Sequence, residues 1–186
     1  MSTPMQRPRR ARVINTSIAS GYTAVYSFHE AIRAVGLEER SLVRAQRIVQ
    51  APQAAARLGL DADASLFNLM RIRLADGIRI ASDQLWIPAE LGRPLLDVDF
   101  TNTALYWELR DHCDVRVTGG SESTRAARAT ATVARELECQ LGDPVFELER
   151  LCYSGATPVE YRETTLVGDR FQLVHFFGDA PESPSV

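Results

Sequence analysis

Several features are missing from this sequence of 186 residues: it has no lysine, and it has only three cysteines. The cysteines never occur in Cys-x-x-Cys spacing, so the sequence predicts neither a disulfide framework nor a zinc site, and it favours a reducing compartment. No apolar run approaches about 18 residues, and the N-terminus has no apolar block of the kind found in signal peptides. We therefore expect a cytoplasmic protein that does not bind a membrane.

Motifs for catalysis and for cofactor binding are also missing. The sequence lacks GxGxxG, GxxxxGK, HExxH and GxSxG, which are typical of dinucleotide, phosphate, zinc and acyl-transfer sites. The three histidines, His29, His112 and His175, stand far apart and have no cluster of Cys, Asp or Glu at metal-ligand spacing. No nucleophile, base and orienting group can be assembled. We expect no metal, no cofactor and no catalytic residues.

The composition predicts one folded domain with flexible ends. Hydrophobic residues make up 45% and charged residues 24% of the chain, which is enough to bury a sizeable core in a single domain. The net charge of −3, from 21 basic and 24 acidic side chains, disfavours binding of nucleic acid by the body of the protein. Residues 1–24, which open with arginines and prolines, predict a basic leader or linker remnant. Residues 25–178 are the expected domain, and 179–186 a flexible tail.

Hydrophobic periodicity alternates between helical and extended patterns along this domain. Two hairpins are expected, one around Ala-Asp-Gly at 75–77 and one around Ser-Gly-Ala-Thr at 154–157. The predicted helices cover 27–37, 53–60, 103–113 and 130–141, and the predicted strands cover 42–50, 66–74, 78–87, 115–126, 145–153, 158–166 and 171–177. The pattern therefore predicts a mixed domain in which hairpins follow short helices.

The two hairpins look like copies of one another. A shift of 79 positions carries Phe67, Leu69 and Arg71 onto Phe146, Leu148 and Arg150. Each hairpin also follows a short predicted helix, so the order helix, strand, turn, strand occurs twice. The sequence therefore predicts a pseudo-duplicated α+β domain with an antiparallel sheet.

Two arginines in the first hairpin are the strongest candidates for binding a ligand. Arg71 and Arg73 are two apart in a strand, so they share a face with apolar residues. Two guanidinium groups on such a face are costly unless they meet an anion, and a carboxylate or phosphate suits their forked donors. The alternative is that both reach solvent or pair with acids such as Asp83 or Glu160.

Glu160 is the acidic candidate. It follows the turn of the second hairpin, and the 79-residue shift places it on Ala81, close to Asp83. A carboxylate at this place can accept hydrogen bonds from hydroxyl or amine groups of a ligand. The alternative is a salt bridge to Arg162.

Six short motifs follow one another in the order and spacing of a known family. They are Arg-x-Arg at 71–73, the Ala-Asp-Gly turn, Ile-Pro at 87–88, Leu-Tyr at 105–106, Pro-Val-Glu at 158–160 and Gly-Asp-Arg at 168–170. From about Tyr26 to Phe177 the chain resembles the UTRA domain, the effector-sensing domain of HutC-type regulators in the GntR transcription factor family. The resemblance implies a chorismate-lyase-like fold, with a six-stranded antiparallel sheet, flanking helices and an effector pocket between them.

The resemblance also implies a function and a set of contacts. It implies a homodimer that binds a small anionic metabolite, a phosphate or carboxylate, and that contacts DNA only through a winged-helix domain absent from this chain. The ligand-binding candidates are Ser27, Arg71, Arg73, Asp83, Thr103, Ala104, Tyr106 and Glu160. Arg71 and Arg73 match an anion-binding pair, and Thr103 with Ala104 matches a helix start that holds the anion. Glu160 matches an acid that contacts the far end of the ligand.

The chain departs from the family at several positions. Leu166 and Phe171 stand where tyrosine is common, Arg79 replaces a common proline, and Ala104 replaces serine. These changes favour an anionic ligand in general over a phosphosugar in particular. Two alternatives stay open: a chorismate-lyase-like enzyme that reuses the same arginine and glutamate, and a headless sensor that forms mixed dimers with a full-length regulator.

Overall fold

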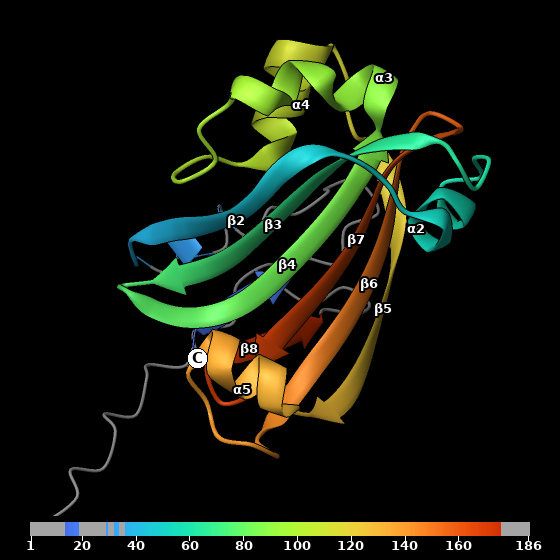
Figure 1. Cartoon of the computed structure of the whole chain (residues 1–186). Helices are drawn as coiled ribbons and strands as arrows, with labels where there is room; N and C mark the ends of the chain where they lie inside the picture. Colours follow the sequence, from blue (N-terminus) through green and yellow to red (C-terminus); the bar gives the residue numbers. More distant parts are fainter. Residues whose placement is uncertain (1–13, 19–28, 30–31, 34–35, 176–186) are drawn as a thin grey trace, which may run out of the picture.

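The fold is built on one six-stranded antiparallel sheet, seen in a computed structural model that describes residues 14–18, 29, 32–33 and 36–175. The strand order is β2-β3-β4-β7-β6-β5 (Figure 1). The strands are β2 (Glu39–Gln50), β3 (Ser65–Ala75), β4 (Ile78–Pro88), β5 (Gly119–Arg128), β6 (Pro144–Ser154) and β7 (Thr157–Val167). This architecture confirms the prediction of an α+β domain with a six-stranded antiparallel sheet.

The sheet consists of two copies of one unit. The 79-residue shift carries the bounds of β3 onto those of β6 and the bounds of β4 onto those of β7. Helix α2 (Pro52–Arg57) precedes β3, and α5 (Ala131–Leu137) precedes β6 in the same way. The two units meet where β4 pairs with β7, so the strand order of one half mirrors that of the other.

The two hairpins turn as the sequence predicts. In the first, Asp76 and Gly77 have φ angles of 48° and 76°, which is the left-handed backbone that a tight hairpin of twisted strands requires. Gly155 has a φ angle of 61° at the equivalent turn of the second hairpin. Both turns therefore depend on residues that tolerate positive φ.

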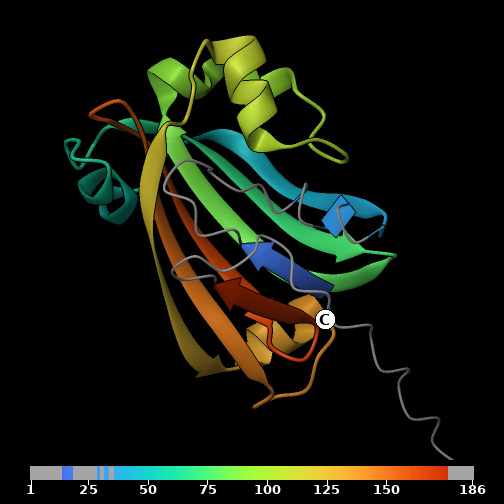
Figure 2. The ribbon, with the colours of Figure 1, turned by 180° about the vertical axis from the view of Figure 1, so that it is seen from behind.

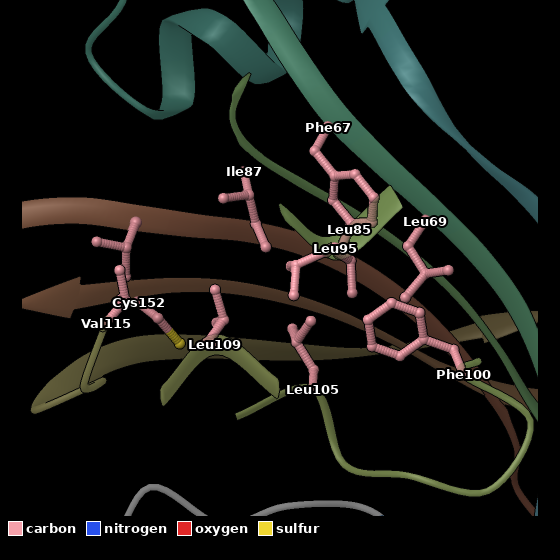
Figure 3. Close-up of a cluster of buried hydrophobic side chains, with 11 residues drawn as sticks. Phe67, Leu69, Leu85, Ile87, Leu95, Phe100, Leu105, Leu109, Val115 and Cys152 are labelled. Atoms are coloured by element: carbon pink, nitrogen blue, oxygen red, sulfur yellow. The ribbon is translucent and has the colours of Figure 1, made fainter. Parts of the chain in front are cut away.

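The two faces of the sheet are covered by different helices. On one face α2 and α5 pack against the sheet, where Ala55 contacts the cluster around Trp86 and Tyr161 and Leu137 contacts Ile72. Over one end of the opposite face lie α3 (Ala89–Gly92), the 3-10 helix η1 (Arg93–Asp97) and α4 (Leu105–Cys113) (Figure 1). Figure 3 shows the core beneath them, which contains Phe67, Leu69, Leu85, Ile87, Leu95, Phe100, Leu105 and Leu109. The rest of that face lies beyond this core and holds the arginines.

Several element boundaries differ from the prediction. Helix α5 ends at Leu137 rather than near 141, because Glu138 adopts a left-handed conformation with φ 51°. The strand expected over 115–126 begins only at Gly119, since Val115 turns into the core around Leu109 instead. Helix α4 begins at Leu105 rather than at 103. None of the described helices is long and apolar enough to cross a membrane.

The last strand does not join the main sheet. Strand β8 (Phe171–His175) pairs in parallel with β1 (Ile14–Ile18), and the two form a separate sheet (Figure 2). Strand β1 lies within residues 1–24, which the sequence predicts to be a leader. Most of the helix expected over 27–37, together with the candidate Ser27, lies outside the described residues.

Candidate effector site

The site lies on the face of the sheet that α4 partly covers. Arg71 of β3 stands directly opposite Asp83 of β4, and Arg150 of β6 stands opposite Arg162 of β7. Because residues two apart on a strand point to the same face, Arg73 and Glu160 join this set. The duplicated sheet thus brings charged side chains from both halves onto one surface.

The first-half arginines are held by buried acids. Arg71 Nη2 lies 2.9 Å from Asp83 Oδ2, and Arg71 Nε donates to Asp83 Oδ1 at 3.3 Å. Arg73 Nη2 lies 2.8 Å from Glu39 Oε1, and its Nη1 lies 3.9 Å from Asp83 Oδ2. The side chains of these four residues are at most 3% exposed. The open alternative that Arg71 and Arg73 pair with acids is therefore what the structure shows, with Asp83 and Glu39 as the partners.

Glu39 is itself fixed from two further directions. Its Oε2 lies 2.6 Å from His29 Nδ1, and its Oε1 accepts a hydrogen bond from Ser41. The His29 ring packs edge-on against Trp107 of α4, with ring centroids 5.3 Å apart. The ionic cluster is thereby connected to the helix that covers it.

The ionisation of this cluster follows from burial and from its neighbours. Burial, together with repulsion from Arg71, lowers the pKa of Arg73 to about 10, which still leaves the side chain charged at neutral pH. Burial alone would raise the pKa of Asp83, but attraction to Arg71, Arg73 and Arg162 outweighs it and holds that pKa below its ordinary value. Asp83 is therefore an ionised carboxylate shared by three guanidinium groups.

Glu160 and Arg162 form a second buried pair on β7. Glu160 Oε1 accepts from Arg162 Nε at 2.6 Å and lies 2.5 Å from Nη2. Arg162 Nη1 also lies 3.7 Å from Asp83 Oδ2, which connects this pair to the first half. Burial lowers the pKa of Arg162, but the combined effect of Glu160, Tyr106 and Asp83 outweighs burial and raises that pKa above its ordinary value. The predicted alternative of a Glu160–Arg162 salt bridge is what the structure shows.

The cluster contains buried polar atoms that have no hydrogen-bond partner among the described residues, and two of them face a possible ligand. They are Arg71 Nη1, a donor, and Glu160 Oε2, an acceptor. Unsatisfied buried groups are rare, because each costs about 1–3 kcal/mol. A ligand that offers an anionic oxygen to Arg71 and an N–H or O–H group to Glu160 would satisfy both.

The second half of the sheet adds a more open ion pair. Arg150 Nε donates to Glu122 Oε2 at 2.7 Å, and Arg150 Nη1 donates to the Tyr106 hydroxyl at 3.3 Å. That hydroxyl also lies 3.4 Å from Cys152 Sγ, and the Tyr106 ring lies 5.7 Å from the Arg162 guanidinium. Burial raises the pKa of Tyr106 well above its ordinary value and raises that of Cys152 to about 12. Neither group ionises at neutral pH, so both act as neutral contacts.

A small pocket, with a cavity volume of about 20 Å³, connects the two halves. It is lined by Arg73, Ala81, Asp83, Glu122, Leu148, Arg150, Arg162, Thr164 and Leu166. Of the predicted candidates, Arg73 and Asp83 line it directly, and Arg71, Tyr106 and Glu160 contact its lining residues. Leu166 offers the pocket an apolar surface at a position where the family often has tyrosine.

Thr103 and Ala104 are not among the residues that line this pocket. Thr103 Oγ1 donates to the carboxylate of Glu108, and Ala104 is buried immediately before α4, where its carbonyl accepts from Glu108 N. Helix α4 still contacts the cluster, through Tyr106. The structure therefore brings together Arg71, Arg73, Asp83, Tyr106 and Glu160, and it leaves the start of α4 to one side.

Four members of the cluster were not among the predicted ligand-binding residues: Glu39, Glu122, Arg150 and Arg162, of which Arg162 was expected only as an alternative partner of Glu160. The 79-residue shift contains a signal for two of them, because it carries Arg71 onto Arg150 and Asp83 onto Arg162. The two glutamates offer no such signal, because each stands in a polar run that is typical of a surface segment.

The six-stranded antiparallel sheet with its flanking helices is the fold of the effector domains of transcriptional regulators. The sequence model of the UTRA domain matches residues 34–172, and the chain belongs to this family. Its relatives are transcriptional regulators of the GntR family, and its structural neighbours include UTRA effector domains.

Three comparisons illustrate the relationship. The HTH-type transcriptional repressor NagR of Bacillus subtilis is 28% identical over 152 residues, which cover 81% of this chain and 62% of the repressor. The crystal structure of the effector domain of PhnF from Mycobacterium smegmatis superposes with a TM-score of 0.76 at 25% identity, covering 87% of this chain and 99% of that domain. The C-terminal domain of the histidine utilization repressor from Pseudomonas syringae gives a TM-score of 0.69 at 21% identity, covering 76% and 99%. The chain thus spans under two thirds of the repressor NagR but nearly the whole of two isolated effector domains.

Proposed function

We propose that this chain is the effector-binding and dimerisation domain of a bacterial GntR-type regulator of the HutC subfamily, with 25–178 as the sensing domain. It binds a small anionic metabolite and thereby modulates DNA binding by a winged-helix segment outside this chain. The proposal includes a cytoplasmic location and no chemistry of its own. The named relatives support it, since NagR and PhnF are HTH-type transcriptional repressors.

One observation supports ligand binding most directly: the buried donor Arg71 Nη1 and the buried acceptor Glu160 Oε2 lack partners among the described residues. A phosphate or carboxylate oxygen is the natural partner of the guanidinium, because such bonds are charge-assisted. A hydroxyl or amine is the natural partner of the carboxylate. The expected effector therefore combines an anionic group with a hydrogen-bond donor.

Binding is coupled to the rest of the regulator through α4. Tyr106 contacts Arg150 and Arg162, and Trp107 contacts the His29–Glu39 pair. A ligand that rearranges the cluster changes the contacts of this helix, and a bias of about 1–3 kcal/mol between two arrangements of a dimer is sufficient for regulation. Size-exclusion chromatography with light scattering tests the dimer, and a monomer at micromolar concentration would contradict that part of the proposal.

Thermal unfolding with a panel of phosphates and carboxylates tests the binding part. A ligand at 100 times its Kd stabilises the fold by about 2.7 kcal/mol, which is readily seen. The variant Arg71→Gln/Asp83→Asn removes both charges of one buried pair together, so it keeps the net charge and avoids a lone buried ion. We expect it to fold and to lose the shift. The exposed pair Arg40–Glu38, changed to Gln in the same way, is the matched control.

Two results would contradict the proposal. In the first, no anion in the panel stabilises the unmodified chain. In the second, the Arg71→Gln/Asp83→Asn variant responds to anions as strongly as the unmodified chain does. A loss of response in the Arg40→Gln/Glu38→Gln control would show that the effect is general electrostatics.

A further inference from the structure

We propose that Glu122 occupies an anion subsite at Arg150, and that an oxyanion of the effector replaces the Glu122 carboxylate there. The inference rests on the proposed function, and it names a second place in the pocket where a phosphate or carboxylate group binds. Glu122 is then an internal competitor that keeps the subsite closed until the effector arrives.

The geometry at Arg150 is that of an oxyanion site. The Glu122 carboxylate lies opposite the guanidinium across the β5–β6 pair, with Oε2 at 2.7 Å from Nε and 2.5 Å from Nη2. The forked arginine donors suit a phosphate or carboxylate of a ligand equally well. The Tyr106 hydroxyl holds the third nitrogen, Nη1, at 3.3 Å. Arg150 is therefore already oriented toward the place that the Glu122 oxygen fills.

The charge balance of the cluster explains why an acid must leave. Four arginines (Arg71, Arg73, Arg150 and Arg162) are each within 3 Å of one of four acids (Glu39, Asp83, Glu122 and Glu160). Among the described residues of the cluster, the four acids balance the four arginines, so an added anion meets no net positive charge from them while all four acids stay in place. Binding of an anionic effector is strong only when one internal carboxylate moves to water and frees its arginine.

Of the four acids, Glu122 needs the least free energy to leave its arginine and turn into solvent. Its side chain is 24% exposed, whereas those of Glu39, Asp83 and Glu160 are at most 3% exposed. It stands on β5, the edge strand of the sheet, so a change of rotamer places its carboxylate in solvent. Breaking a deeply buried pair costs several kcal/mol, whereas a partly exposed pair contributes about 1 kcal/mol or less.

Replacement of Glu122 by an effector oxyanion would also change the structure around the pocket. When an effector oxyanion replaces Glu122, Arg150 keeps its Tyr106 contact, and the negative charge on β5 turns away from the pocket. The lining runs from Asp83 and Arg73 to Arg150, so the space that the Glu122 carboxylate leaves adjoins the buried ion pairs of the first half. The effector class that fits is a short metabolite with two polar ends: a phosphate or carboxylate at Arg150, and an anionic oxygen with a hydroxyl or amine group at Arg71 and Glu160.

Isothermal titration with inorganic phosphate at constant ionic strength tests the exchange. Glu122→Gln removes the competing charge and keeps the size of the side chain, so phosphate should bind about fivefold more tightly than to the unmodified chain. Glu147→Gln is the matched control. Glu147 pairs with Arg125 across the same two strands at 2.6 Å, but it points to the opposite face, since it stands three residues from Arg150. That control removes the same charge and should leave phosphate affinity unchanged.

Several titration results would overturn the proposed subsite at Arg150. A Glu122→Gln affinity that equals or falls below that of the unmodified chain overturns the inference, and so does an equal gain in Glu147→Gln. Adding Arg150→Gln to Glu122→Gln should abolish the gain, and a gain that persists would place the anion elsewhere. If the unmodified chain binds phosphate through Arg71 but Glu122→Gln changes nothing, only this inference fails. If neither the unmodified chain nor the Glu122→Gln variant binds phosphate, the proposed subsite is wrong. The proposed function is then tested separately, by thermal unfolding with the other anions of the panel.

Discussion

The two halves of the sheet have equivalent strands, but their ion pairs differ in how far they are buried. In the first half, the Arg71–Asp83 and Arg73–Glu39 pairs are almost fully buried. In the second half, the Arg162–Glu160 pair on β7 is also buried, but the Arg150–Glu122 and Arg125–Glu147 pairs that join β5 and β6 are between about a tenth and three quarters exposed. Buried pairs are rigid because breaking them is costly, and exposed pairs exchange easily with water or with a ligand. The buried, rigid ion pairs therefore lie on β2, β3, β4 and β7, and the exchangeable ion pairs lie on β5 and β6.

Removal of an acid should destabilise the protein far more at Asp83 than at Glu122, and this is the largest effect that we expect. Asp83→Ala leaves Arg71, Arg73 and Arg162 without the carboxylate that they share, so the free energy of unfolding should fall by about 3–5 kcal/mol. Glu122→Ala should cost less than about 1 kcal/mol, because the pair that it breaks is partly hydrated. Urea denaturation at neutral pH measures both. Equal losses in the two variants would show that the halves do not differ in the way proposed.

The two halves also differ in the burial of equivalent phenylalanines, which the 79-residue shift relates to each other. Phe67 is fully buried and packs against Phe100, with ring centroids 6.5 Å apart, whereas its counterpart Phe146 is half-buried at the edge of another cluster. Phe67→Ala should therefore cost about 3–5 kcal/mol, and Phe146→Ala about 1–2 kcal/mol. The same denaturation experiment compares them, and a larger loss at Phe146 would reverse the assignment of the rigid half.

The buried Asp83 pairs should also make the stability of the protein depend on pH. The pKa of Asp83 is lowered in the folded state, so its ion pairs stabilise the fold above the unfolded-state pKa of about 4, and that stability is lost as the pH falls through this range. The Arg71→Gln/Asp83→Asn variant lacks this contribution. Its free energy of unfolding should therefore fall less than that of the unmodified chain between about pH 6 and about pH 3. Parallel curves would show that Asp83 does not drive acid sensitivity.

Much of the fold was predictable because it depends on local signals. The Ala-Asp-Gly turn requires two residues with positive φ, and Asp76 and Gly77 supply them. The 79-residue shift was visible in three identities, and the structure matches the bounds of β3 and β6 to it. The pairing of β8 with β1 was not predictable, because parallel pairing between chain segments so far apart is set by tertiary packing and leaves no turn signal in the sequence.

The candidate site was predictable in its arginines but not in their partners. Arg71 and Arg73 stood out because two cations on one face of a strand demand an anion. Glu39 gave no such signal, since it stands between Glu38 and Arg40 in a run typical of a solvated surface. Only the register of β2 against β3 turns it inward toward Arg73. Internal acids that neutralise a binding site are therefore found from strand pairing rather than from spacing along the chain.

The smallest expected effect concerns the helix that joins the two halves. Tyr106→Phe removes the hydroxyl that accepts from Arg150 and neighbours Cys152, but it keeps the ring that lies against Arg162. The free energy of unfolding should fall by about 1 kcal/mol or less, because Arg150 retains Glu122 as a partner. Tyr161→Phe is the matched control, since it removes a hydroxyl that donates to Glu163 at 2.9 Å on the opposite face. Phosphate affinity, measured by titration, should change more in Tyr106→Phe than in Tyr161→Phe, because only Tyr106 orients the Arg150 subsite. The opposite ranking would show that α4 does not act on the pocket through this hydroxyl.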